Sequence, residues 1–276
     1  MISTPYTFIL HLGWFQILVD CSEVPRWVGP LQKRYARFLA SRLEAIPPFC
    51  ISLLPGQSTL PYPENKLPAF TEQKVIFTPP GWEGEIDLPA QTGWMRPGSA
   101  FILEEVDYFL RVVTSLQAFR TGGLLFHAAG IVRAEKAYAF LGHSGAGKTT
   151  ISRLSGEEHV MNDDLILLYP TSPGWSVYST PFFNPKQVTP CSVFQAPLAG
   201  LYCLAKDSQV YLEKVSSGQA LAEIIANIPI ISANRHTTVE LLTRCQTLLT
   251  EVPMYRLHFR KDASFWGVIE KGQGGG

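Results

Sequence analysis

Runs of apolar residues in the first hundred positions predict short strands and one helix. Pro30 opens a segment that extends to Ile46, in which apolar side chains recur at helical spacing, so we expect an amphipathic helix there. Prolines then interrupt the chain repeatedly up to Pro97. Residues 1–98 therefore predict a small α+β domain. The strands expected within it cover residues 6–12, 15–19, 49–54 and 74–78.

A different pattern begins at Glu104 and predicts a second domain over residues 104–270. One long amphipathic helix is expected up to Arg120, where Gly122 and Gly123 supply the positive φ angles that end a helix. A hairpin follows, and its second strand leads into a glycine-rich turn and another helix. Residues 271–276 are expected to form a flexible tail. The remaining elements are strands at 124–132, 136–141, 197–204, 209–215 and 252–259, and helices at 219–227 and 237–249.

The amino-acid composition indicates which class of protein this is. Hydrophobic residues make up 46% of the 276 positions and charged residues 17%, which favours a compact globular chain over a disordered one. Lys plus Arg and Asp plus Glu both number 23, so no basic face is indicated and we expect no nucleic-acid partner.

The cysteines and the apolar runs indicate the cellular compartment. Five scattered cysteines without a C-x-x-C pair fit neither a disulfide framework nor a zinc site. No apolar run approaches the roughly 18 residues that a membrane span needs. We therefore expect a cytoplasmic protein without a membrane partner.

The segment GHSGAGKT, residues 142–149, carries the strongest chemical signal. It matches G-x-x-x-x-G-K-[ST], and it lies between a predicted strand and a predicted helix, as a phosphate-binding loop must. Lys148 would bridge the β and γ phosphates, and the Thr149 hydroxyl would ligate Mg²⁺. The predicted nucleotide-binding residues are Gly142, Ser144, Gly145, Ala146, Gly147, Lys148, Thr149 and Thr150.

Two adjacent acids, Asp163 and Asp164, follow this loop after only 163 − 149 = 14 residues. Adjacent carboxylates repel each other, but beside a nucleotide one can bind Mg²⁺ while the other accepts the proton of an attacking hydroxyl. The sequence leaves both assignments open. As a working hypothesis we assign Asp163 as the base and Asp164, together with Thr149, as the Mg²⁺ ligands.

His127-Ala128-Ala129, the hairpin, GHSGAGKTT and MNDD together resemble the catalytic domain of the HPr serine kinase/phosphorylase superfamily, which shares its nucleotide fold with ATP-dependent phosphoenolpyruvate carboxykinase. The resemblance covers roughly residues 104–262 and extends to HPr-kinase-like proteins found beside peptide-modification genes. It implies an α/β fold in which a P-loop domain of this type follows the small α+β domain. It also implies ATP and Mg²⁺ as cofactors, and it places His127 beside the phosphate site as a third catalytic candidate with Asp163 and Lys148.

Three departures separate the chain from the best-known members of the superfamily. The glycine-rich signature that follows the acidic pair in HPr kinases is absent, so HPr itself is not the expected acceptor. Leu165-Ile166 stand where the carboxykinases carry Glu-His, which disfavours decarboxylation. His143 stands where the bifunctional kinases carry an Asp.

The sequence therefore predicts a kinase that phosphorylates a hydroxyl of a peptide, a protein or a small metabolite. The alternatives are a non-catalytic nucleotide-binding sensor or assembly module and a carboxykinase-like enzyme. The irregular stretch 180–197, with Phe182 and Phe183, is the candidate cover over the acceptor. The donor nucleotide and homo-oligomerisation are left open.

Overall fold

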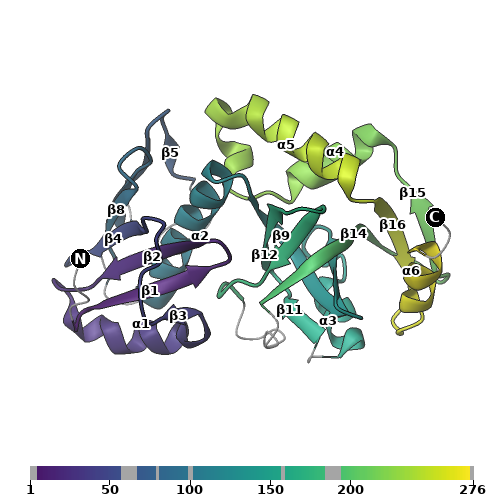
Figure 1. The fold of residues 1–276 in the computed structure, drawn as a ribbon, viewed down its shortest axis with the longest axis horizontal. Helices are drawn as coiled ribbons and strands as arrows, with labels where there is room; N and C mark the ends of the chain where they lie inside the picture. The colour runs from purple at the N-terminus through teal and green to yellow at the C-terminus, as the bar shows by residue number, and fades with distance from the viewer. Residues whose placement is uncertain are drawn as a thin grey trace. The chain divides into compact units, whose positions relative to one another are not determined.

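The computed structural model divides the chain into two compact units, Met1–Arg120 and Thr121–Gly276. The predicted boundary lay before the long helix, but helix α2 (Ile102–Arg120) groups with the first unit (Figure 1). The structure describes residues 5–56, 67–78, 81–98, 102–156, 159–183 and 194–273.

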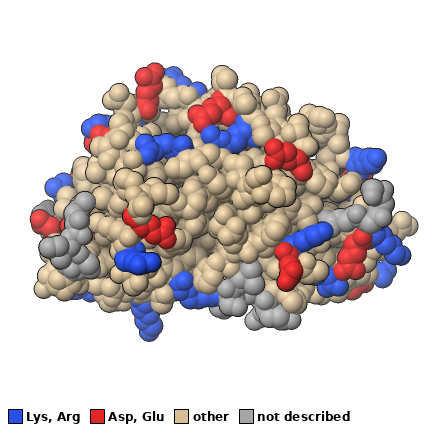
Figure 2. Space-filling view, viewed as in Figure 1, with Lys and Arg blue, Asp and Glu red and all other residues tan. Residues whose placement is uncertain are grey.

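Charged side chains of both signs are interspersed on the face shown in Figure 2. Cys21, Cys50, Cys203 and Cys245 are free thiols, while Cys191 lies outside the described residues. Within the described ranges, no helix is long and apolar enough to cross a membrane.

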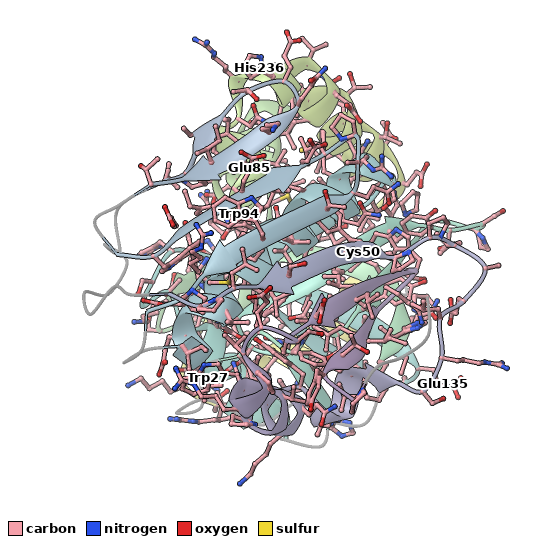
Figure 3. The ribbon with its side chains drawn as sticks, turned by 90° about the vertical axis from the view of Figure 1, so that its left-hand side faces the viewer. Trp27, Cys50, Glu85, Trp94, Glu135 and His236 are labelled. Atoms are coloured by element: carbon pink, nitrogen blue, oxygen red, sulfur yellow. The ribbon has the colours of Figure 1, made fainter. Side chains whose placement is uncertain are left out.

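The first unit is built on a mixed sheet whose strand order is β3-β1-β2-β4-β8-β7-β6-β5. Side chains alternate between a buried face and an outward face along β4, β6, β7 and β8. Cys50, Glu85 and Trp94 lie on the outward face (Figure 3). The strands are β1 (Thr7–Leu12), β2 (Phe15–Asp20), β3 (Leu39–Ala40), β4 (Phe49–Leu53), β5 (Ala69–Phe70), β6 (Lys74–Phe77), β7 (Glu83–Asp87) and β8 (Thr92–Arg96).

The helix expected at residues 30–46 is wrong in extent. The chain instead forms η1 (Pro25–Trp27), α1 (Val28–Arg34) and η2 (Ala36–Phe38). Leu39 and Ala40 leave the helical path because they pair with β1 as the short strand β3. Backbone pairing with a sheet edge has overridden the helical spacing of the side chains.

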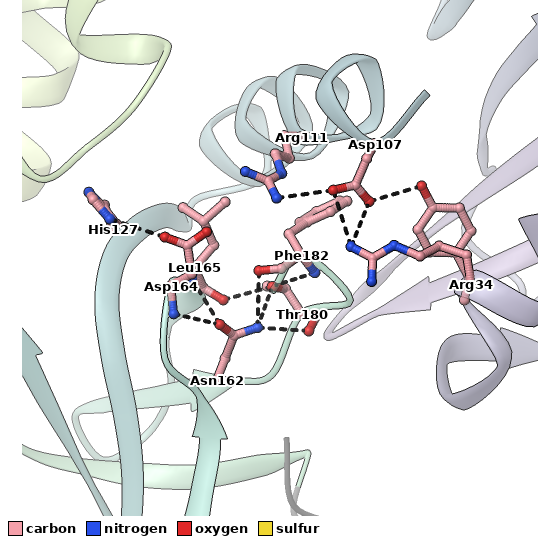
Figure 4. A network of polar contacts seen from close by, with 10 residues as sticks. Arg34, Asp107, Arg111, His127, Asn162, Asp164, Leu165, Thr180 and Phe182 are labelled. Carbon is pink, nitrogen blue, oxygen red and sulfur yellow. Dashed lines mark hydrogen bonds and ion pairs between the residues drawn. The ribbon is translucent and has the colours of Figure 1, made fainter. Parts of the chain in front are cut away.

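Helix α2 packs on the buried face of this sheet. Phe109 lies 5.4 Å from the ring of Phe77 and 5.7 Å from that of Trp82, between ring centroids. Asp107 is buried and accepts hydrogen bonds from Arg111 at 3.0 Å and Tyr35 at 3.1 Å (Figure 4). These contacts explain why α2 belongs to the first unit rather than the second.

The second unit contains a sheet that closes on itself. The strand order is β10-β9-β12-β13-β14-β16-β15, and β10 also pairs with β14, so the strands from β10 to β14 form a ring. The hairpin predicted at residues 124–141 is confirmed as β9 and β10. The strands are β9 (Leu124–Arg133), β10 (Lys136–Leu141), β11 (Val160–Asn162), β12 (Leu165–Pro170), β13 (Trp175–Tyr178), β14 (Gln195–Lys206), β15 (Tyr211–Lys214) and β16 (Met254–Phe259).

Helices cover the second unit's sheet and include one that the sequence did not predict. Helix α6 (Phe265–Gln273) contains residues 271–273 of the expected flexible tail, because Phe265 and Ile269 insert into the core beside Phe140. Residues 274–276 lie outside the described residues. The other helices are α3 (Lys148–Ser155), α4 (Ser217–Ala226), η4 (Ile231–Ala233), η5 (Arg235–Thr237) and α5 (Thr238–Glu251).

The parallel strands β10, β14 and β16 end at one edge of the sheet. Leu141, the last residue of β10, is in register with Cys203 of β14, which is in register with Arg256 of β16. The glycine-rich loop leaves from this edge, as ligand-binding loops of α/β sheets commonly do.

Candidate functional site

The predicted loop connects β10 directly to helix α3. Gly142, Gly145 and Gly147 have φ angles of +154°, +82° and +122°, which L side chains rarely adopt. A Cβ atom on Gly142 would lie 2.6 Å from the Cβ of Ala146, and one on Gly147 would lie 2.6 Å from the Phe259 ring. The loop therefore needs glycine for its backbone path and for its close packing on β16.

Lys148 begins α3 and is 8% exposed. Its Nζ donates a hydrogen bond to the Gly142 carbonyl oxygen at 2.6 Å. Burial lowers the pKa of Lys148, while the carboxylates of Asp164 and Asp163 act in the opposite direction. The lysine and both acids therefore lie within electrostatic reach of one another.

The other residues of the predicted loop differ in their exposure to solvent. Ser144 and Gly145 are exposed, and Thr149 and Thr150 are half-buried in the first turn of α3. Ala146 is buried, and its N–H donates to the His143 carbonyl at 3.0 Å. In this conformation the Ala146 N–H is used within the loop, so it cannot also contact a phosphate.

Strand pairing explains how the acidic pair comes near the loop. Strands β11 and β12 both pair with β9, with Asn162 opposite Gly130 and Leu165 opposite His127. Asp163 and Asp164 form the turn between these two strands. Because β9 also pairs with β10, the turn lies two strand spacings, about 10 Å, from β10, close to the level at which the loop begins.

The two acids differ in exposure and in partners. Asp163 is 1% exposed. The Asp164 side chain is 21% exposed, and its Oδ1 lies 3.1 Å from Nε2 of His127, whose side chain is 40% exposed (Figure 4). The backbone N–H of His127 donates to the Asn227 carbonyl at 2.7 Å, directly after α4. A histidine held against a carboxylate in this way can accept, hold and release a proton.

No protein-family model matches the chain. No curated protein matches it either. The geometry of the site, together with the motifs, therefore carries the functional argument.

Oxygen ligands suitable for Mg²⁺ are present at the loop. Among the described residues, no group of three or more His, Cys, Asp and Glu side chains could hold a metal by itself. Mg²⁺ usually takes only one or two carboxylates and completes its shell with phosphate oxygens and water. The Thr149 hydroxyl and the partly exposed Asp164 carboxylate fit that kind of site.

The expected cover over the acceptor is only partly described. Residues 184–193 lie outside the described residues. Phe182, which was expected to contact the acceptor, is 0% exposed and belongs to the core, so that expectation is wrong. An aromatic residue in an irregular, proline-rich stretch gives no sequence signal that separates a buried anchor from a binding surface.

Sequence reasoning passed over Asn162, which forms the base of the acidic turn. It is 0% exposed, its Oδ1 accepts from the Asp164 N–H within the turn, and its Nδ2 donates to the Thr180 carbonyl in a separate segment. The only signal in the sequence is its position immediately before the two acids, where a short amide often caps a turn.

A cavity of about 700 Å³ lies at the ends of β10, β14 and β16 that are opposite to the phosphate loop. Tyr202, Tyr255, Ile269 and Glu135 contribute to its walls. It contains none of the predicted site residues, so it is separate from the phosphate loop.

Proposed function

We propose that the chain is a Mg²⁺-dependent kinase that transfers the γ-phosphoryl group of ATP to a hydroxyl of a peptide, a protein or a small metabolite. The observation that carries this proposal is that strand pairing brings Asp163, Asp164 and His127 to the edge of the sheet where the loop with Lys148 begins. The motifs in residues 127–164, which resemble those of HPr-kinase-like proteins, support the same reaction.

The loop and the start of α3 bind phosphate through two effects. Backbone N–H groups of a glycine-rich turn form a concave donor surface, and the N-terminus of a helix carries partial positive charge. Lys148 adds a full charge, and its bond to the Gly142 carbonyl is one that a phosphate oxygen would replace. Its position in the first turn of α3 directs it at the same anion.

Thr149 and Asp164 are the residues that would hold Mg²⁺. When bound, the ion neutralises charge on the phosphate oxygens and so lowers the barrier to transfer. The Asp164 carboxylate can serve this purpose because it is partly exposed and lies 3.1 Å from His127.

The proton of the acceptor hydroxyl needs a base in the same site. In the transfer, the acceptor oxygen bonds to the γ-phosphorus, the bond from that phosphorus to the bridging oxygen breaks, and ADP leaves. The hydroxyl proton passes to His127, which is 40% exposed and paired with Asp164, or to Asp163, which is 1% exposed and would need the turn to move before it met an acceptor. Both candidates lie on the side of the loop where the acidic turn approaches β10.

The test is a nucleotide-consumption assay with ATP, GTP, ADP and pyrophosphate as donors and with serine-containing peptides, proteins and hydroxylated metabolites as acceptors. Lys148→Ala should abolish ATP consumption because the β and γ phosphates lose their buried cation. Lys136→Ala, at the opposite end of β10, is the matched control and should keep the wild-type rate. Wild-type turnover in Lys148→Ala would overturn the proposal. Tight ATP binding without turnover would favour the sensor or assembly module.

A further inference from the structure

The side chain of Asn162 engages the acidic turn with its oxygen. Oδ1 accepts hydrogen bonds from the backbone N–H of Asp164 at 2.8 Å and of Leu165 at 3.0 Å. These two bonds span the point at which the Asp164 side chain leaves the backbone. Rotation of this peptide unit would break both bonds, so the direction of the Asp164 carboxylate depends on Asn162.

The amide nitrogen of Asn162 engages a second segment, residues 179–183. Nδ2 lies 3.0 Å from the Thr180 carbonyl oxygen, 3.2 Å from the Thr180 hydroxyl and 3.3 Å from the Phe182 carbonyl oxygen (Figure 4). Exchanging the amide's oxygen and nitrogen would set donors against the two N–H groups and an acceptor against these oxygens. The surroundings therefore fix the amide in one orientation.

Thr180 closes the arrangement. Its Oγ1 donates to the Leu165 carbonyl at 2.7 Å, while the Leu165 N–H is bound by Asn162. Leu165 is thus held at both of its backbone polar groups, and it is the residue in register with His127 on β9. Asn162 and Thr180 together hold the backbone of Leu165, which follows Asp164 and pairs with His127. We call these contacts the clamp.

We infer that Asn162, with Thr180, is a positioning residue of the proposed kinase site. It fixes the Asp164 carboxylate against His127 and within reach of Lys148, and it contacts neither nucleotide nor acceptor. The inference rests on the proposed function for its kinetic consequence. Partners behind the reacting groups commonly change activity by about 10-fold to 100-fold when they are removed.

Two substitutions test the clamp, and a third controls for the loss of a buried hydrogen bond. Thr180→Val keeps the shape of the side chain but removes the hydroxyl that donates to the Leu165 carbonyl and accepts from Asn162 Nδ2 and the Phe182 N–H. Asn162→Asp keeps the acceptor for Asp164 and Leu165 but turns a second oxygen toward the carbonyls of Thr180 and Phe182. Ser179→Ala removes a 2.7 Å bond to the Met161 carbonyl in the same segment without touching the acidic turn.

We expect Thr180→Val and Asn162→Asp to lower kcat about 10-fold to 100-fold, with the dissociation constant of metal-free ATP within about twofold of wild type. Ser179→Ala should keep kcat within about twofold of wild type. Thr180→Ser keeps the hydroxyl and should also keep kcat close to wild type. Equal losses of kcat in Ser179→Ala and Thr180→Val would overturn the inference, because burial alone would then explain them. A loss confined to the affinity for metal-free ATP would also overturn it.

A second readout does not depend on turnover. The imidazole NMR signals of His127 should shift in Thr180→Val and Asn162→Asp and stay in place in Ser179→Ala, because only the first two loosen the contact with Asp164. An inactive wild type in which these signals behave as expected would reject the proposed kinase and keep the positioning role. Unchanged His127 signals in all three variants would reject the positioning role.

Discussion

Replacing Gly147 by alanine should damage the loop for two separable reasons. The first is conformational, because a φ of +122° is unfavourable for a residue with a side chain. The second is steric, because the new methyl group would lie 2.6 Å from Cζ of the Phe259 ring, which is itself buried in the core. Gly145 offers a matched comparison, since its φ is +82° but a Cβ there would meet nothing within 4 Å.

The two effects have different sizes. Left-handed backbone costs about 1–2 kcal/mol for an ordinary residue, and overpacking a core adds about 1–3 kcal/mol. Gly145→Ala should therefore lower the free energy of unfolding of the second unit by about 1.5 kcal/mol and Gly147→Ala by about 3 kcal/mol or more. For a domain of this size, 1 kcal/mol corresponds to a shift in Tm of about 2–4 °C. The expected falls in Tm are thus about 3–6 °C and at least about 6–12 °C.

Thermal unfolding of the full chain, followed by calorimetry with and without ATP, measures both variants. Because both substitutions disturb the donor surface for phosphate, the stabilisation by ATP should shrink in each. Equal Tm values for Gly145→Ala and Gly147→Ala would refute the contact between Gly147 and Phe259 as the source of the difference. A wild-type Tm in Gly147→Ala would refute the loop conformation itself.

Two further predictions concern Phe182 and the carboxylate of Glu213. Phe182→Ala should cost about 3–5 kcal/mol of stability because the ring is fully buried, whereas Phe183→Ala should cost less; an increased acceptor KM in a Phe182→Ala protein of wild-type stability would contradict this. A hydrogen bond from His258 at 3.0 Å holds the pKa of Glu213 below its ordinary value of 4.5, so the stabilisation it brings is present above pH 4.5 and is lost as the pH falls through the lowered pKa. His258→Gln should return the Glu213 pKa toward 4.5 in a carboxyl NMR titration, and an unchanged midpoint would show that the hydrogen bond is not the cause.

The sequence predicted the elements whose patterns are local. The hairpin, the loop and the helix that starts at Lys148 follow from glycine spacing and from apolar runs, and the structure contains all three. The proximity of the acidic pair to the loop was also accessible, because a short connection of this length can only return to a neighbouring strand. The family resemblance alone suggested that His127 lies beside the phosphate site, and the contact of Asp164 with His127 was not predicted.

Features that depend on distant parts of the chain were not predictable in this way. The closure of the second sheet requires β10 to pair with β14, about sixty residues later in the chain. Helix α6 was missed because its apolar residues are few and the glycines beyond them suggested a frayed end. Asn162 was missed because its importance comes from Thr180 and Phe182, which only the fold brings to it.

The most direct test of the proposed kinase activity is phosphoryl transfer from γ-labelled ATP to a hydroxyl acceptor by the wild type, Asp163→Asn and Asp164→Asn, with ATP affinity measured in the same proteins. If Asp163 is the base, Asp163→Asn should bind Mg²⁺-ATP normally and lose about 100-fold to 10,000-fold in rate. If Asp164 ligates the metal, Asp164→Asn should bind Mg²⁺-ATP more weakly. A wild type that transfers label to a hydroxyl, with both variants impaired, is the predicted result. A wild type that binds ATP but labels no acceptor, with both variants binding equally well, would contradict the proposed kinase activity.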